Sequence, residues 1–305
     1  MEMYTDNINI KRRLLYGSYK FLKNIGYIRI KNIFKNYANI LIFHRINDFD
    51  SDTLTTPTPL FKNMVKALRN NYKICSLQDL IMRIKNKEVL DPKTVVITFD
   101  DGYKDNFVNA APILKKYDIP ATFFITSGYI NTDNILPWDK KSVLRHPLMA
   151  WDEVRELVQM GFDIGAHTVN HINLGEASLD TARKEITGCK AHIEREIDKE
   201  INTFAFPFGR SNCIRDEVIE IIKEAGFDCC CSAYGGKVTK DTDLYNLYRI
   251  PVYPNTIELK MEIDNFMTCF DGKMKINLWP VFGLFLSNIW DIEFNSQVFS
   301  ITNML

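Results

Sequence analysis

Two adjacent carboxylates, Asp100 and Asp101, directly follow the β-branched apolar run 94–99 and precede Gly102. A run of this composition predicts a buried strand, and the glycine permits a sharp turn at its end. Like charges at the end of a buried strand are costly unless a cation or a catalytic task holds them there. A solvated turn is the alternative, and the pair alone does not decide between the two.

Two imidazoles occur four residues apart, at His167 and His171. With a carboxylate from a neighbouring segment they form a His-His-Asp set that binds a divalent metal and leaves a position open for water. Two nitrogen ligands and one oxygen ligand favour Zn²⁺, and Co²⁺, Ni²⁺ or Mn²⁺ also fit. Such an ion lowers the pKa of bound water toward about 7, and a second carboxylate can take the proton. These residues therefore predict metal-assisted hydrolysis.

The elements that must position these residues alternate between strand-like and helical patterns. Gly161 and Gly226 end helical patterns and precede apolar runs, as expected where helices lead into parallel strands. Seven such units predict an α/β fold, a distorted (β/α)7 barrel. The predicted strands are 39–43, 95–99, 121–125, 162–166, 203–206, 228–232 and 248–252. The predicted helices are 60–70, 77–86, 106–117, 151–160, 179–197, 214–225 and 257–269.

The unusual polar residues all fall just after predicted strands. His44 follows the first strand, the two aspartates follow the second, His167 follows the fourth and the segment 207–209 follows the fifth. The carboxyl ends of barrel strands meet at one rim, where active sites are built. We therefore expect these residues to converge at one place.

Three segments resemble, in order and spacing, the signature segments of the polysaccharide deacetylases, also called NodB-homology domains or family-4 carbohydrate esterases. They are Thr-Phe-Asp-Asp-Gly at 98–102, His-Thr-Val-Asn-His at 167–171 and Phe-Pro-Phe-Gly at 206–209. The likeness spans about residues 39–253. It implies a distorted barrel that hydrolyses N-acetyl groups on amino sugars. The roles it implies are general base for Asp100, metal ligand for Asp101, His167 and His171, and an oxyanion-hole backbone N–H for Phe208.

The chain departs from this family pattern at two places. Where the family has an arginine two residues before the proline, this chain has Ala205, so we expect Arg249 to tune the base instead. The late Leu-x-His segment that supplies the general acid is missing, and His44 resembles the early histidine that takes this role in the poly-N-acetylglucosamine branch. We therefore assign His44 as the acid. The residues predicted to line the substrate site are Tyr103, Trp138, Pro207 and Arg249.

Three other functions remain open from the sequence. The same residues could deformylate or deacetylate a lipid-linked single sugar. Asp100 and Asp101 could bind Mg²⁺ in a phosphatase, although the two histidines argue against it. The missing arginine is also compatible with a carbohydrate-binding protein that has no catalytic activity.

Composition limits the location and the partners. The 305 residues carry 38 basic and 38 acidic side chains, and the seven cysteines include no CxxC pair, so reduced thiols and no structural zinc site are expected. Neither a secretory signal nor an apolar run of about 18 residues is evident, which predicts a cytoplasmic location. A carbohydrate substrate and no nucleic-acid partner are expected. His146 and His192 are interpreted as solvated surface residues.

The two ends of the chain differ from its middle. Residues 9–36 have apolar positions at helical spacing with cations between them, which predicts a basic amphipathic helix broken near Gly26. Such a helix could lie on an anionic membrane, at the inner face, or pack across the core with its cations solvated. The predicted division is 1–37 for this N-terminal segment, 38–270 for the barrel and 271–305 for a C-terminal extension.

Overall fold

A computed structural model of the chain describes residues 10–28, 36–91, 93–252 and 254–266. The chain divides into two compact units. The larger unit, Ile30–Leu259, contains the sheet, and the smaller unit combines Met1–Arg29 with Lys260–Leu305. Only residues 10–28 and 260–266 of the smaller unit are described. The predicted C-terminal extension 271–305 therefore lies outside the described residues.

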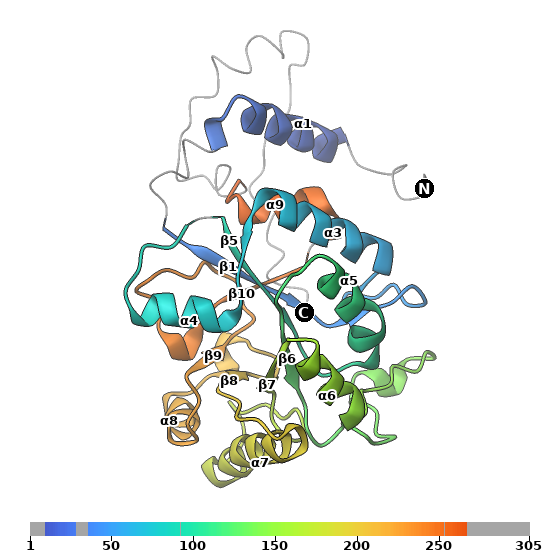
Figure 1. Cartoon of the computed structure of the whole chain (residues 1–305), viewed down its shortest axis with the longest axis vertical. Helices are drawn as coiled ribbons and strands as arrows, with labels where there is room; N and C mark the ends of the chain where they lie inside the picture. Colours follow the sequence, from blue (N-terminus) through green and yellow to red (C-terminus); the bar gives the residue numbers. More distant parts are fainter. Residues whose placement is uncertain (1–9, 29–35, 92, 253, 267–305) are drawn as a thin grey trace. The chain divides into compact units, whose positions relative to one another are not determined.

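The larger unit is built on a parallel sheet whose strands follow the order β10–β1–β5–β6–β7–β8–β9 (Figure 1). A short strand, β4 (Lys73–Ile74), adds to the start of β5, and β2 (Arg45–Ile46) pairs separately with β3 (Thr55–Thr56). The seven main strands are β1 (Ala38–Phe43), β5 (Thr94–Phe99), β6 (Thr122–Ile125), β7 (Asp163–Ala166), β8 (Thr203–Ala205), β9 (Cys229–Cys231) and β10 (Arg249–Pro251).

The two ends of this sheet approach each other. Cys231 is in β9, at one end of the sheet order. It forms a parallel bridge with Leu247, which lies just before β10 at the other end. The Ser232 N–H also donates to the Leu247 carbonyl at 2.9 Å. The sheet is therefore a nearly closed barrel of seven strands, which confirms the predicted fold class.

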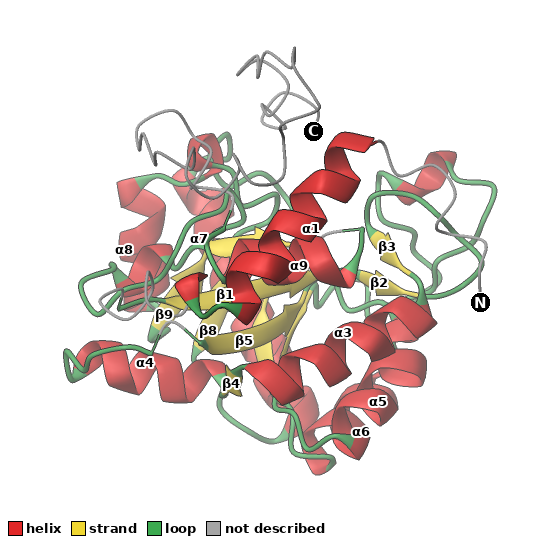
Figure 2. Ribbon diagram, turned by 90° about the horizontal axis from the view of Figure 1, so that it is seen from above, coloured by secondary structure: helices red, strands yellow, loops and turns green. Residues whose placement is uncertain are grey.

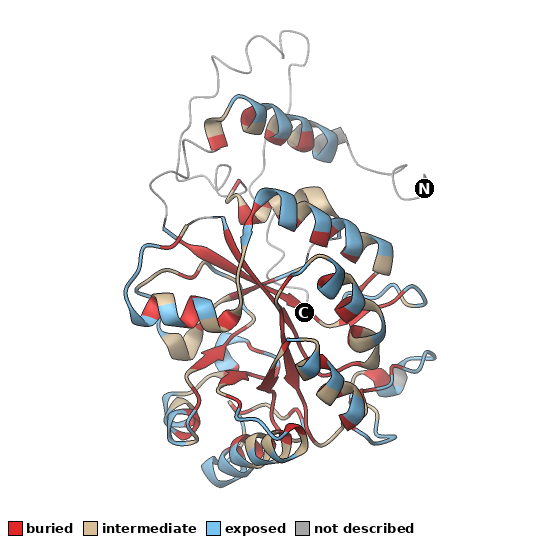
Figure 3. Ribbon diagram, viewed as in Figure 1, coloured by how far each residue is buried: buried red, intermediate tan, exposed pale blue. Residues whose placement is uncertain are grey.

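Helices lie outside this sheet, with exposed residues on their outer faces and buried residues toward the strands (Figures 2 and 3). The segment predicted as a helix at 106–117 begins with a π-helical turn, Asn106–Ala110, and continues as α5. The helices are α3 (Thr58–Asn71), α4 (Leu77–Lys85), α5 (Ala111–Lys116), α6 (Trp151–Gln159), α7 (Leu179–Ile197) and α8 (Asp216–Glu224). α9 (Thr256–Ile263) crosses the boundary between the two units.

Local sequence explains these boundaries. All six residues of β5 are buried, as expected for a β-branched strand covered on both faces. Ser76 and Asp79 form a capping box at the start of α4, and the Ser178 side chain caps α7. Gly161 and Gly226 follow helices at φ of +92° and +80°, a conformation that glycine adopts at low cost. The predicted strands and helices of the larger unit are thus confirmed to within a few residues.

The described part of the smaller unit centres on α1 (Ile10–Asn24). The Tyr19 hydroxyl and the Lys23 ammonium both donate to Asp264, at 2.6 and 2.7 Å, and the Tyr19 ring packs edge-on against Phe266. The predicted N-terminal helix is confirmed over α1, whereas residues 29–35 lie outside the described residues. Among the helices of the described ranges, none combines the length and hydropathy needed to cross a bilayer.

Candidate metal centre and active site

Three side chains from two neighbouring strand ends meet at one rim of the barrel. Asp101 follows β5, whereas His167 and His171 follow β7. The Asp101 Oδ1 atom lies 3.5 Å from His167 Nε2 and 3.3 Å from His171 Nε2. One ligand atom from each residue lies within 4.8 Å of the others, and all three residues are buried. The predicted ligand set is therefore brought together by the fold.

The donor atoms of this cluster suit a divalent cation. Asp101 Oδ1 is buried and has no hydrogen-bond partner, which is costly for a carboxylate unless a cation binds there. Two imidazole nitrogens and one carboxylate oxygen are the usual ligands of a catalytic zinc site with an open position. The residues present thus fit a metal ion of this class.

His167 is oriented by the backbone of the next strand. Its Nδ1 atom lies 2.8 Å from the Ala205 carbonyl oxygen, to which it can only donate, so in the neutral ring the Nε2 lone pair faces Asp101. Burial lowers the pKa of His167, but Asp100 and Asp101 raise it more, and the net pKa lies above its ordinary value. At position 205, where the family pattern has an arginine, the backbone carbonyl of Ala205 thus orients His167, and the alanine side chain makes no polar contact.

Asp100 is held by the predicted arginine. The Arg249 guanidinium donates to both carboxylate oxygens, at 2.6 and 2.7 Å, and also to Ser232 O and Thr98 Oγ1. Arg249 has no exposed surface. Burial raises the pKa of Asp100, but Arg249 and His167 lower it more, so the net pKa lies below its ordinary value. Asp100 is therefore ionised near neutral pH, as a general base must be.

His44 follows β1, the strand between β10 and β5 in the sheet. Its carbonyl accepts a hydrogen bond from Asn106 Nδ2 at 2.6 Å, which fixes the backbone at this point. Burial lowers the pKa of the His44 side chain, whereas Asp101 and Asp100 raise it, and the net pKa is lowered. The side chain thus lies in the electrostatic field of both aspartates.

The turn after β8 carries Phe208 at a φ of +61°, with 48% of the residue exposed. Pro207 beside it is buried. Gly209 is required next, because a Cβ there would lie 2.6 Å from the backbone nitrogen and Cβ of Ala233. The turn therefore packs tightly on its neighbour at Gly209, whereas Phe208 remains partly exposed.

Aromatic rings surround His171. The centroid of the Trp138 ring lies 4.5 Å from that of His171, and the Phe208 ring lies 4.8 Å away on an edge-on approach. Trp138 is half-buried and lies beside the candidate metal ligand His171. A half-exposed indole next to a polar site is a suitable surface for a sugar ring.

A buried hydrogen-bond chain holds Trp138. Its indole N–H donates to the Tyr103 hydroxyl at 2.8 Å, and this hydroxyl donates to Asp139 at 2.7 Å. Arg45 donates to the other Asp139 oxygen at 2.9 Å. Tyr103 is fully buried, so it contacts Trp138 rather than the surface. Arg45 and Asp139 were not predicted as site residues, and their only signal in the sequence is that each directly follows a predicted site residue.

The interpretation of His146 as a solvated residue is wrong. His146 is buried, with Nε2 3.0 Å from Asp50 and its ring stacked on Phe49, because the loop before β3 folds over it. His192 is half-buried against the Trp151 ring.

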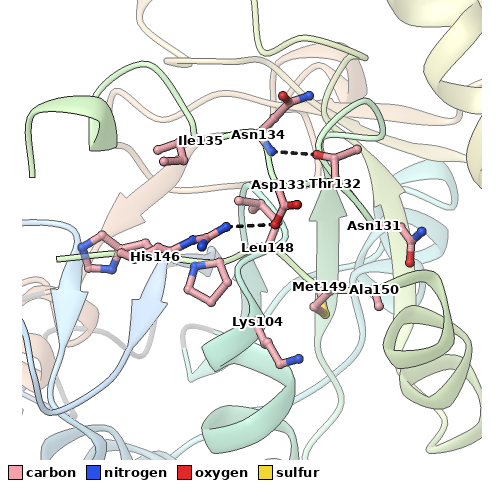
Figure 4. A pocket seen from close by; sticks show the side chains of 12 residues that line it. Lys104, Asn131, Thr132, Asp133, Asn134, Ile135, His146, Leu148, Met149 and Ala150 are labelled. Atoms are coloured by element: carbon pink, nitrogen blue, oxygen red, sulfur yellow. Dashed lines mark hydrogen bonds and ion pairs between the residues drawn. The ribbon is translucent and has the colours of Figure 1, made fainter.

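A polar pocket lies beside the turn that follows β5, where Met149 N–H donates to the Gly102 carbonyl (Figure 4). It is formed mainly by residues 131–135 and 145–150. Two of its charged groups, Arg145 and Asp133, form an ion pair at 2.9 Å. None of the three candidate metal ligands lines it, so this pocket is separate from the metal cluster.

Comparison with known proteins finds a family model that matches the part of the chain containing this cluster. The family model described as polysaccharide deacetylase matches residues 87–230. This range includes the two aspartates, both histidine ligands and the Phe208 turn, whereas His44 and Arg249 lie outside it.

Individual relatives align with a longer stretch of this chain than the family model does. A poly-β-1,6-N-acetyl-D-glucosamine N-deacetylase of Staphylococcus aureus is 25% identical over 244 residues, which cover 77% of this chain and 79% of that protein. The structure of the Streptococcus pyogenes deacetylase PplD in complex with acetate superposes with a TM-score of 0.63 at 25% identity, over 76% of this chain and 97% of that one. IcaB from Ammonifex degensii shares the fold, with a TM-score of 0.65 at 21% identity over 75% and 97% of the two chains.

Proposed function

We propose that the chain is a member of the polysaccharide deacetylase family, whose model matches residues 87–230, and that it is a metal-dependent hydrolase that removes N-acetyl groups from an N-acetylamino sugar in a glycan. The observation that carries the proposal is the buried cluster of Asp101, His167 and His171 beside the ionised Asp100. This cluster combines a cation site with a base, which are the two parts that metal-assisted amide hydrolysis requires.

Asp101, His167 and His171 would hold the metal, for which Zn²⁺ is our first choice because two of the three ligands are imidazoles. When bound, an ion of this class acidifies water and polarises a carbonyl oxygen. His167 is prepared for this role by its bond to the Ala205 carbonyl, and Asp101 by its unpaired oxygen.

We assign the proton transfers to residues of the chain. Asp100, held ionised by Arg249, takes a proton from the attacking water. The Phe208 backbone N–H donates to the oxygen that becomes negative in the tetrahedral intermediate. His44, in its protonated form, gives a proton to the departing amine, so that acetate and a free amino sugar are released. Because the pKa of His44 is lowered, this form is the minor one near neutral pH.

The substrate we propose is an N-acetylglucosamine polymer or its precursor. Two features support it: the Staphylococcus aureus relative is named for such a polymer, and His44 resembles the early histidine of that branch. The sequence suggested a non-catalytic carbohydrate-binding protein because the arginine at position 205 is missing. Arg249 supplies a guanidinium to Asp100 from another strand, which argues against that alternative.

The test is product analysis on β-1,6-linked N-acetylglucosamine oligomers with Zn²⁺-loaded protein. Mass spectrometry should find a loss of acetyl groups with an equal amount of acetate, and the Asp100→Asn variant should form neither. Release of formate from a lipid-linked formamido sugar, with no acetate from the oligomers, would favour the deformylase. Glycan binding without any released acid would favour the non-catalytic protein.

We also propose a cytoplasmic location with α1 at the inner face of the membrane. On α1 and just after it, exposed Arg13 and Lys20 accompany exposed Phe21 and Ile25, with 46% and 55% of these two apolar residues accessible. The full chain should therefore sediment with anionic vesicles and not with neutral ones, and a Phe21→Ser variant should sediment less. Equal sedimentation with both vesicle types would contradict the proposal.

A further inference from the structure

Glu185 of α7 binds the segment that carries both histidine ligands. Its Oε2 atom accepts the backbone N–H of Asn170 at 2.8 Å, and its Oε1 atom accepts the Asn170 side-chain amide at 2.6 Å. Asn170 directly precedes His171. A single carboxylate thus fixes both the backbone and the side chain of the residue next to a candidate metal ligand.

The segment between the two histidines has a conformation that needs such support. Thr168 and His171 have φ of +63° and +52°, in a left-handed region that is unfavourable for non-glycine residues. On one side, the Ser127 and Gly128 N–H groups donate to the carbonyls of Thr168 and Val169, at 3.2 and 2.9 Å. The approach at Gly128 is close, since a Cβ there would lie 2.6 Å from the Val169 carbonyl oxygen. Glu185 holds the other side.

The burial of Glu185 requires an explanation. The residue is only 7% exposed, and no ion pair within the described ranges involves it, so a negative charge is buried without a cation. Such a charge is tolerated only when hydrogen bonds stabilise it, and Asn170 supplies two. None of the proton transfers assigned above uses Glu185.

We infer that Glu185 is a positioning residue for the metal site. By holding Asn170, it fixes the backbone next to His171, whose Nε2 atom lies 3.3 Å from Asp101 Oδ1. Partners of this kind are typically worth a factor of about 10 to 100 in metal affinity. The inference rests on the proposed function, because it assumes that His171 binds a metal.

The alternative is that Glu185 only attaches α7 to the barrel. The two roles differ in what a substitution changes. Loss of a structural contact lowers the free energy of unfolding and leaves the metal affinity of the folded protein unchanged. Loss of a positioning contact weakens metal binding in protein that is still folded.

The experiment is a Co²⁺ titration of chelator-stripped full chain, followed by the visible absorption of the bound ion, whose shape depends on coordination geometry. Glu185→Gln keeps the size of the side chain but turns one acceptor into an amide that faces the donors of Asn170. We expect its Co²⁺ dissociation constant to rise about 10- to 100-fold, with an altered absorption band. Glu220→Gln is the control, because Glu220 is an exposed carboxylate of α8 that pairs with Lys223.

A second variant tests the same contact from the other side. Asn170→Ala removes the side-chain donor and should also weaken Co²⁺ binding, and the double variant should be no weaker than Glu185→Gln alone. If Glu185→Gln does not fold, the Co²⁺ dissociation constant of the Asn170→Ala variant tests the inference instead. A folded Glu185→Gln or Asn170→Ala protein with the wild-type dissociation constant and band would overturn the inference. Absence of Co²⁺ binding by the wild type would instead overturn the proposed function.

Discussion

The Arg249 guanidinium lies against both oxygens of the Asp100 carboxylate, at 2.6 and 2.7 Å, although the two residues are 149 positions apart in the sequence. They meet because only one strand, β1, separates β10 from β5 in the sheet. A bidentate pair of this geometry fixes the carboxylate plane as well as its charge. The proposed base is therefore oriented by a residue that lies outside the three segments that resemble the family pattern.

The first prediction concerns Arg249→Lys. A lysine keeps the charge but cannot form the two parallel bonds, so Asp100 loses its fixed orientation. We expect kcat to fall by about 10²-fold, because small displacements of a catalytic group have effects of this size. Steady-state kinetics on the metal-loaded protein measures it. Arg183→Lys is the matched control, since Arg183 forms an exposed pair with Glu224; an equal loss of kcat in both variants would contradict the role of Arg249.

The second prediction concerns His44→Ala. If His44 protonates the departing amine, its loss should lower kcat by about 10²- to 10⁴-fold, the usual contribution of a general acid. The affinity for Co²⁺ should be unchanged, since His44 is not one of the three candidate ligands. Parallel assays of turnover and Co²⁺ binding test both statements. Unchanged turnover in a folded, metal-loaded variant would show that another group is the acid.

The third prediction concerns Tyr103→Phe. Removal of the hydroxyl leaves the Trp138 indole N–H and one Asp139 oxygen without their present partner. The free energy of unfolding should drop by about 1 to 3 kcal/mol. The KM for glycan oligomers should rise more than kcat falls, because Trp138 loses its fixed position beside His171. Urea unfolding and steady-state kinetics provide the two values, and a fall in kcat at constant KM would argue against a role in substrate binding.

The fourth prediction concerns the pH dependence of stability. Burial raises the pKa of Asp163 at the start of β7, Asp79 raises it further and Lys199 opposes them. Because the pKa is higher in the folded state than in the unfolded chain, the ionised carboxylate destabilises the fold above the folded-state pKa. This cost disappears as the pH falls below the unfolded-state pKa of about 3.9.

Asp163→Asn should therefore increase the free energy of unfolding at pH 7, with a gain that shrinks as the pH is lowered toward about 4. Urea unfolding across this range measures the gain. Asp133→Asn provides a control, since the Asp133 side chain is fully exposed. A gain that is constant with pH, or that grows on acidification, would refute this explanation.

Most of the barrel could be predicted from the sequence because its signals are local. Strand runs such as β5 and helix-ending glycines such as Gly161 depend on residue type and spacing, and tertiary packing moved their boundaries by only a few residues. The candidate ligand set was predictable too, because polar residues at the carboxyl ends of parallel barrel strands lie on one rim.

Other features depend on contacts between segments far apart in the sequence. The burial of His146 follows from the loop around Asp50, and no spacing in the chain indicates it. The hydrogen bonds that run from Arg45 through Asp139 and Tyr103 to Trp138 connect β2 with a segment 94 positions later in the sequence. Glu185 looks like any other charged helical residue until α7 is placed against the 167–171 segment. Such contacts are set by the folded packing rather than by local pattern.

The central claim is that Asp101, His167 and His171 hold one divalent ion. The most direct test is a crystal structure of Zn²⁺-loaded protein with anomalous data recorded at the zinc absorption edge. We expect a single strong peak at about 2.0 to 2.2 Å from one Asp101 oxygen and from the Nε2 atoms of both histidines. A map without a peak at this cluster, or with zinc bound only by other residues, would contradict the claim.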